Sequence, residues 1–287
     1  MGGVLRFMVV PFRYLTLAQS DSHQMTDLQL TTIGTSAAWY NPGEACSGFL
    51  LEADGRRVLI DCGSGVIARY LALFGEAAPI DAIVLSHVHA DHCFDLVPLK
   101  FGIDYGTLGA WAPELWLPPN ARERLTRLVS AWDADFSYFE ETFTVREYGI
   151  DQPFEVGPFA VSALRVPHFI ESFALRFDTP QTSFGYTADT GPCAELGPFM
   201  RGVDLLLAEA ACPEDVEDTP GRGHISAGEA ADIATAAGAH SLLLTHVPHE
   251  IGFDVATAAA AARFAGPVAV ATGGHRYDVA RRLAAVS

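Results

Sequence analysis

From Met25 onward, short apolar runs typical of β-strands alternate with longer runs that have helical periodicity. Asp54 and Gly55 between two such runs predict a hairpin turn. Ser226 followed by Glu229 predicts a capping box at the start of a helix. Strands are expected at 28–34, 47–53, 56–62, 81–86, 114–118, 142–148, 159–166, 172–178, 183–189, 203–210, 241–246 and 268–272. Helices are expected at 63–75, near 93–103, from Asn120, at 226–238 and near 254–265.

The predicted strands lie on both sides of the chain's midpoint, with helices between them. This order predicts an α/β fold, which can also be described as a four-layer α+β arrangement. Two mixed β-sheets would pack face to face, with helices on the outside. No linker, low-complexity tract or strong repeat interrupts the pattern, so we expect one domain over residues 25–287. Residues 1–24 would be a poorly ordered extension.

The apolar start of the chain does not have the pattern of a signal peptide, because Arg6, Pro11 and Arg13 interrupt it. No segment reaches the ~18 apolar residues of a membrane span. Five cysteines without a CxxC pair are typical of reduced thiols in a cytoplasmic protein, and we interpret Cys93 as a packing residue. We therefore expect a cytoplasmic protein with no membrane partner.

The charge balance disfavours a polynucleotide partner. The 287 residues include 18 Lys and Arg against 35 Asp and Glu, a formal net charge of −17. Nucleic-acid binding depends on Lys and Arg that neutralise phosphates, and here these residues are scattered. Small anions remain possible substrates because bound metal ions can supply local positive charge.

The stretch LSHVHADHCFD, residues 85–95, concentrates metal-type side chains at the end of a predicted strand. Its positions 87–92 hold three of the ten histidines and one aspartate: His87, His89, Asp91 and His92. Imidazole nitrogen and carboxylate oxygen suit zinc, and also manganese or iron. Three further donors each follow an apolar run directly: His168, Asp189 and His246. The alternative is a turn with solvated histidines, which predicts no relation to those distant residues.

HVHADH is an HxHxDH motif, and with the three later donors it resembles the ligand set of the metallo-β-lactamase superfamily over roughly residues 27–275. The resemblance implies an αββα sandwich that binds two divalent metal ions, Zn²⁺ first and Mn²⁺ or Fe as alternatives. It assigns His87, His89 and His168 to the first metal. It assigns Asp91, His92 and His246 to the second, with Asp189 bridging both. We assign no role to His23, His240, His249 or His275, although His249 is close enough to His246 to line the rim.

Two metal ions can activate water for hydrolysis of a phosphodiester, a lactam, a lactone or a thioester. Glu209 follows an apolar run and His224 precedes a predicted helix. This pair resembles the ribonuclease Z-like branch, in which a Glu orients a His that protonates the leaving group. The alternative is a surface carboxylate and an ordinary loop histidine.

The sequence departs from ribonuclease Z proper at two places. His168 and Asp189 are only 21 positions apart, whereas those enzymes carry a long transfer-RNA-binding arm there. Their early motif has Glu-Gly-Thr-Gln after Asp-Cys-Gly, but this chain has DCGSGV at 61–66. The chain resembles compact bacterial proteins without the arm, which include cyclic-nucleotide phosphodiesterases. Both departures make transfer RNA an unfavoured partner.

The leading hypothesis is a dinuclear-metal phosphodiesterase for a small substrate such as cAMP. A metal-bound hydroxide, held with Asp91, would attack phosphorus, and His224, oriented by Glu209, would act as general acid. The alternatives are a ribonuclease Z-type RNA 3′-end endonuclease, a lactonase or β-lactamase, and a non-catalytic module. A homodimer is possible. The aromatic-rich region 100–140 could line a base-binding rim, form an oligomer contact or cover the helices, and we favour the last.

Overall fold

The computed structural model describes residues 28–132, 137–281 and 283. The predicted extension at 1–24 lies outside the described residues. The described elements form two seven-stranded sheets. Among these residues no helix is long and apolar enough to cross a membrane.

The first sheet collects the N-terminal strands and one strand from the C-terminal end of the chain. Its order is β14-β1-β2-β3-β4-β5-β6. Pairing is antiparallel from β14 to β3 and parallel from β3 to β6. The bounds are β1 Gln29–Gly34, β2 Gly48–Ala53, β3 Arg56–Ile60, β4 Ala82–Val84, β5 Glu114–Leu117, β6 Thr144–Glu147 and β14 Arg276–Asp278.

The second sheet contains the later strands in the order β13-β12-β11-β10-β9-β8-β7. Here β7 to β10 are antiparallel, and β10 to β13 are parallel. The bounds are β7 Phe154–Val156, β8 Phe159–Val166, β9 Ser172–Asp178, β10 Ser183–Tyr186, β11 Leu205–Glu209, β12 Leu242–Thr245 and β13 Val268–Val270.

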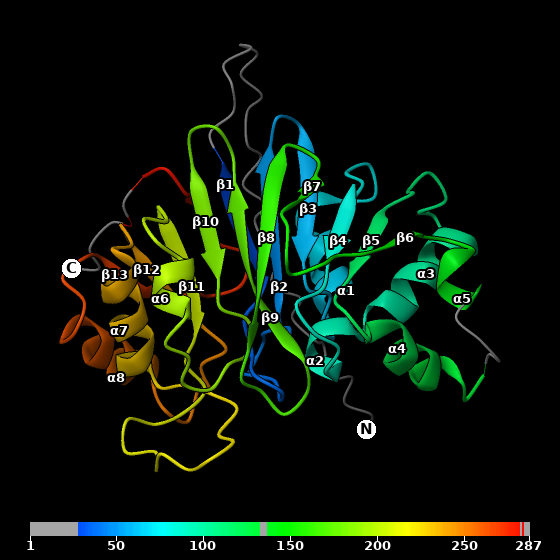
Figure 1. Ribbon diagram of the computed structural model, residues 1–287. Coiled ribbons are helices and arrows are strands. Elements are labelled where there is room, and N and C mark those ends of the chain that lie inside the picture. Colours follow the sequence, from blue (N-terminus) through cyan, green and yellow to red (C-terminus); the bar gives the residue numbers. More distant parts are fainter. Residues whose placement is uncertain (1–27, 133–136, 282, 284–287) are drawn as a thin grey trace, which may run out of the picture.

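The helices lie on the outer faces of the two sheets, which pack against each other in the middle (Figure 1). They are α1 Val66–Phe74, α2 Ala90–Cys93, α3 Leu96–Asp104, α4 Ala121–Val129, α5 Ser137–Glu140, α6 Leu196–Phe199, α7 Ala227–Ala237 and α8 Phe253–Ala261. One apolar cluster fills the space between the sheets, a second lies under α1, α3 and α4, and a third lies under α6, α7 and α8. The predicted four-layer αββα fold class is therefore confirmed.

Local sequence explains why the central strands form. All residues of β11 (LLLAE) and β12 (LLLT) are buried, as expected of parallel strands covered on both faces. Asp54 and Gly55 both have positive φ, 48° and 74°, which suits the predicted tight hairpin between β2 and β3. The capping box of Ser226 and Glu229 is present at α7. These predictions are confirmed.

The strand ends differ from the prediction where the polar side chains lie. The strands predicted at 81–86 and 183–189 end at Val84 and Tyr186. Asp61, Ala188 and His246 have left-handed backbone with φ of 58°, 52° and 57°, so the chain turns out of the sheet at these positions. The short strands β7 and β14 and the single-turn helices were not predicted.

Candidate metal centre

The predicted donors come from both sheets and meet at one edge of the sandwich. His87 and His89 follow β4 of the first sheet, and α2 carries the next two donors. His168, Asp189 and His246 follow β8, β10 and β12 of the second sheet. Side chains 159 positions apart in sequence are thereby brought into one cluster.

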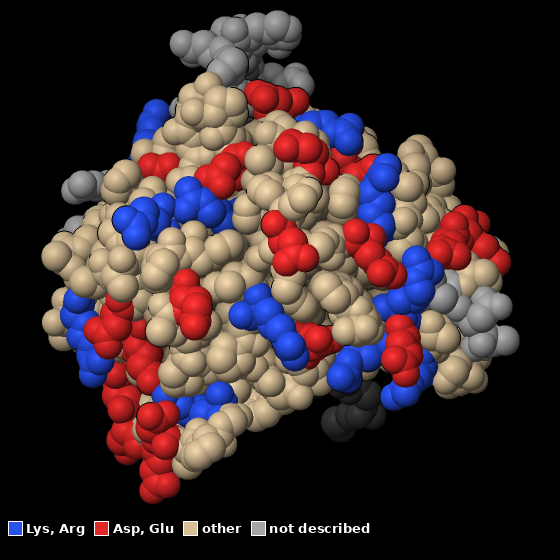
Figure 2. All heavy atoms as spheres, in the orientation of Figure 1, with Lys and Arg blue, Asp and Glu red and all other residues tan. Residues whose placement is uncertain are grey.

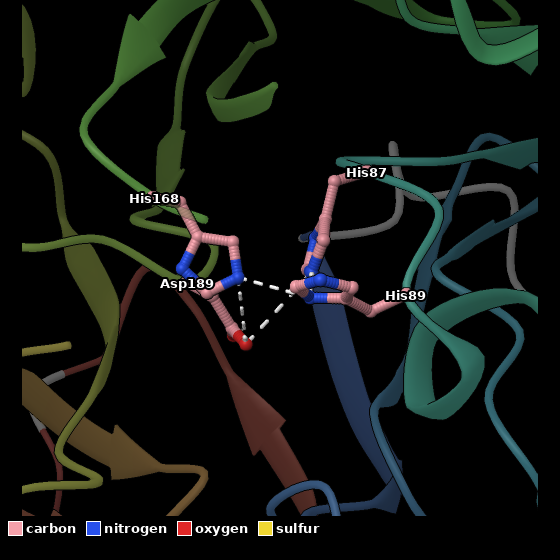
Figure 3. Close-up of side chains that lie close together, drawn as sticks. All are labelled: His87, His89, His168 and Asp189. Atoms are coloured by element: carbon pink, nitrogen blue, oxygen red, sulfur yellow. Dashed lines mark hydrogen bonds and ion pairs between the residues drawn. The ribbon is translucent and has the colours of Figure 1, made fainter. Parts of the chain in front are cut away.

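One group of four side chains could hold a first metal ion: His87, His89, His168 and Asp189. His89 Nδ1 lies 3.2 Å from His87 Nε2 and 3.0 Å from His168 Nε2. Asp189 Oδ2 lies 3.8 Å and 3.9 Å from the same two Nε2 atoms. Figure 3 shows His168 facing His87 and His89 across this space, with Asp189 beside them.

A second group shares Asp189 and adds Asp91, His92 and His246. Asp91 Oδ2 lies 3.3 Å from His92 Nε2 and 3.4 Å from His246 Nε2. Asp189 Oδ2 lies 3.3 Å from His92 Nε2. Within each group all donor atoms lie within 4.8 Å of one another. The structure therefore brings together all seven donors singled out in the sequence, with Asp189 between the two groups.

The donor set fits divalent cations. Burial, followed by the neighbouring His168, lowers the pKa of His89 to about 4, so its ring is neutral at pH 7 with a lone pair to give. Asp91 Oδ2 and His92 Nε2 are buried without a hydrogen-bond partner among the described residues. Buried polar atoms of this kind need a partner, and a cation between them would supply one. A nitrogen-rich set of this composition suits zinc, manganese or iron.

His92 would exchange a proton for the metal. Burial lowers the pKa of its ring, but the carboxylates of Asp189, Asp61 and Asp91 outweigh this and raise it well above the usual value. A cation that binds His92 Nε2 must displace that proton, which makes metal affinity fall at low pH.

Asp61 supports this group, and the sequence reasoning did not identify it. Its buried carboxylate lies 2.8 Å from His92 Nδ1 and accepts hydrogen bonds from Ser86 N, Ser86 Oγ and the Tyr186 hydroxyl. A carboxylate on the second ring nitrogen fixes the orientation of a metal-binding histidine. The signal that identified the donors, a polar residue directly after an apolar strand, also applies to Asp61 after β3.

The Glu209 and His224 side chains meet beside the seven donors. Glu209 Oε1 lies 2.9 Å from His224 Nδ1. The carboxylate is fully buried and also accepts hydrogen bonds from the backbone N–H groups of Thr190 and Ala211, so its position is fixed. The His224 ring centroid is 5.0 Å from that of His168 and 5.6 Å from that of His246.

Glu209 also sets the charge of His224. Burial disfavours the imidazolium, but the adjacent carboxylate outweighs it and raises the pKa of His224 to about 9. In this state the ring is protonated at neutral pH. Because Nδ1 faces Glu209, Nε2 is the ring atom left to meet a substrate.

The remaining candidates lie outside these groups. Cys93 is buried in the apolar cluster under α1 and α3, and burial raises the pKa of its thiol to about 12, as expected of a packing residue. His240 pairs with Asp204 on the surface, and His275 contacts Thr272. His249 contacts Asn41, and His23 lies outside the described residues.

Comparison with known proteins agrees with this arrangement. Residues 56–247 match the family described as the beta-lactamase superfamily domain. The chain belongs to the metallo-β-lactamase superfamily. It is 35% identical over 258 residues to the probable metallo-hydrolase YhfI of Bacillus subtilis, with 88% of this chain and 100% of that protein covered. The crystal structure of YhfI superposes with a TM-score of 0.79 at 29% identity, over 88% of this chain and 99% of that one.

Within the superfamily the chain falls in the ribonuclease Z-like branch. It is 26% identical over 276 residues to a ribonuclease Z of Mycobacterium bovis, covering 88% of this chain and 98% of that protein. A diphosphatase of the PhnP family shares the metallo-β-lactamase fold, with a TM-score of 0.66 at 20% identity over 87% of this chain and 97% of that one. Between His168 and Asp189 this member forms only β9 and β10.

Proposed function

We propose that this superfamily member is a metal-dependent hydrolase of small phosphodiesters, with a cyclic nucleotide such as cAMP the favoured substrate. The hydrogen bond between Glu209 and His224, 2.9 Å long and beside the seven metal-type donors, carries the proposal. A sugar alkoxide is a poor leaving group unless a proton reaches it, and an oriented histidine beside the reaction centre can supply that proton.

The relatives support hydrolysis as the reaction class. YhfI is described as a probable metallo-hydrolase, and the ribonuclease Z relatives are named as nucleases, whose substrates are phosphodiesters. In this chain the same type of bond would lie between the donor cluster and His224.

Each group of residues in the site would have its own role in the reaction. Two divalent cations, Zn²⁺ by preference and Mn²⁺ or Fe as alternatives, would lower the pKa of water and neutralise phosphate charge when bound by the seven donors. Asp91, whose Oδ2 lies 3.3 Å from His92 Nε2 and 3.4 Å from His246 Nε2, would orient the attacking water and accept its proton. Glu209 holds the ring of His224, whose Nε2 delivers the proton to the departing oxygen.

An RNA 3′-end endonuclease is the second candidate, because ribonuclease Z is among the relatives. Two features favour a small substrate instead. Only β9 and β10 separate His168 from Asp189, and the net charge is −17. Figure 2 shows Lys and Arg scattered among Asp and Glu on the face drawn, without a broad basic surface there.

The test compares leaving groups in His224→Ala. We expect kcat with cAMP to fall roughly 10²–10⁴-fold, the usual contribution of a general acid. Turnover of bis-p-nitrophenyl phosphate should fall much less, because p-nitrophenolate leaves without a proton. Metal content, measured by elemental analysis, should stay at the wild-type level.

His240→Ala is the matched control, since His240 forms a similar contact with Asp204, 3.0 Å away, on the surface. It should keep full activity. Equal cAMP turnover in wild type and His224→Ala would refute the role of His224. Wild-type protein that hydrolyses nitrocefin, a lactone or precursor transfer RNA, and no small phosphodiester, would refute the substrate class.

A further inference from the structure

Phe169 is an exposed aromatic side chain beside His168 and His224 of the candidate site. It follows His168 in the loop between β8 and β9, and 66% of its surface is exposed. Its ring centroid lies 5.1 Å from the His168 ring and 5.7 Å from the His224 ring. A solvent-exposed phenyl ring therefore lies next to both a metal-type donor and the proposed proton donor.

The backbone holds this ring in place. A Cβ atom on Gly223 would lie 2.8 Å from Cε2 and Cζ of Phe169, so the ring packs directly against the glycine. His168 Nδ1 donates to the Gly223 carbonyl over 2.7 Å, which ties the two loops together. Because one side of the ring rests on this support, its exposed surface has a defined place relative to His224.

The ring also lines a cleft of about 590 Å³ that adjoins the donor cluster at His168. This volume is in the range of small-molecule sites. The charged side chains of the cleft are balanced, two positive against two negative: Arg124, Arg165, Glu171 and Glu195. Arg165 also pairs with Glu171 over 3.5 Å. A second phosphate group would meet no net positive charge here, whereas a neutral flat ring could occupy the cleft.

We propose that Phe169 is the platform on which the nucleobase of the substrate stacks, so that the enzyme selects nucleoside phosphodiesters over phosphodiesters without a base. This inference rests on the proposed function, because it places the scissile phosphate between the donor cluster and His224. Aromatic rings bind bases of any sequence through their π-faces, so the platform selects for a base without choosing among bases.

Two esters with the same leaving group test the platform. The p-nitrophenyl ester of thymidine 5′-phosphate carries a base, and methyl p-nitrophenyl phosphate does not. In Phe169→Ala we expect kcat/KM for the thymidine ester to fall roughly 5- to 150-fold, mainly through KM. The methyl ester should be turned over as by wild type. Phe169→Trp should retain the preference for the base.

Phe101→Ala is the matched control, because it removes a phenyl ring on α3 that is 44% exposed. It should leave both esters unaffected. If Phe169→Ala slows both esters equally, the ring only supports the loops and the inference is wrong. A wild-type enzyme with no preference for the thymidine ester would also overturn it.

A binding measurement separates this inference from the proposed function. Calorimetry with adenosine 5′-monophosphate and ribose 5-phosphate compares two ligands that differ by the base alone. Wild type should bind the nucleotide more tightly, and Phe169→Ala should lose that difference. If neither ester is hydrolysed, the proposed function fails. The calorimetry then still tests the platform on its own. If wild type binds adenosine 5′-monophosphate more tightly than ribose 5-phosphate and Phe169→Ala loses that difference, the platform is supported. If wild type binds the two ligands equally, the platform is refuted.

Discussion

The Glu209 carboxylate faces His224 in a buried environment, and this contact determines when the ring is charged. With the carboxylate in place the pKa of His224 is about 9. A general acid works only while it is protonated, so kcat/KM should fall as the pH rises through this pKa. Bound cations would lower the pKa in wild type and variants alike, which makes a comparison between them informative.

Glu209→Gln removes the charge and keeps a side chain of similar shape. Without the Glu209 carboxylate, burial lowers the pKa of His224 and the weaker effect of Asp189 opposes it only in part, so the proton is lost at a lower pH. We expect the alkaline limb of the pH profile of kcat/KM with cAMP to move toward acid by roughly 1 to 3 pH units. An unchanged alkaline limb would show that His224 is not the titrating acid.

Single residues were predictable where the signal is local. His168, Asp189 and His246 each follow an apolar strand, so they could be identified without knowing the fold. Asp61 obeys the same rule but was not assigned a role. Phe169 gave no signal, because its position depends on Gly223, which is 54 positions away and meets it only through the fold.

At the level of elements, the loop after β3 and the short helix α2 form one unit. Cys62 N donates to His92 O over 2.7 Å, and Ser47 N donates to Asp91 O over 3.1 Å. A Cβ atom on Gly63 would lie 1.9 Å from the Asp91 carbonyl oxygen. Only glycine permits this close approach, which sets the position of α2 and of its two donors.

Gly63→Ala should therefore displace α2. We expect a loss of stability of roughly 1–3 kcal/mol from overpacking, with reduced occupancy of the metal group that contains Asp91 and His92. Urea unfolding and elemental analysis measure the two effects. Gly149→Ala is the matched control, since a Cβ there meets nothing within 4 Å. Wild-type stability and metal content in Gly63→Ala would contradict the argument.

Helices and strands could be predicted from the sequence where a clear apolar pattern marks them. The buried strands β11 and β12 were identified from continuous leucine runs. The three-residue strands β7 and β14 have no such pattern, and β14 exists because it pairs with β1. Strands were predicted too long at the donor edge, because the pattern does not show where the backbone changes to positive φ.

At the level of the whole molecule, the donor cluster joins the two halves of the sandwich. His87 and His89 follow a strand of the first sheet, whereas His168, Asp189 and His246 follow strands of the second. Strand content was predictable from the sequence, but the assignment of strands to sheets was not, since β14 joins the N-terminal sheet from the far end of the chain. Cations bound here would link both sheets.

Metal removal should therefore lower the stability of the whole fold. A ligand that binds only the native state stabilises it by about 2.7 kcal/mol at a concentration of 100 Kd. For a chain of this size we expect chelation to lower Tm by roughly 5 to 10 °C, measured by scanning calorimetry with and without Zn²⁺. Asp189 belongs to both donor groups, so Asp189→Asn should abolish most of this metal-dependent difference. Asp204→Asn is the matched control, because the Asp204 carboxylate pairs with His240 on the surface, away from the seven donors. This variant should keep the metal-dependent difference in Tm. Equal Tm values with and without metal in wild type, or a full metal-dependent shift in Asp189→Asn, would show that the seven donors do not hold cations between the sheets.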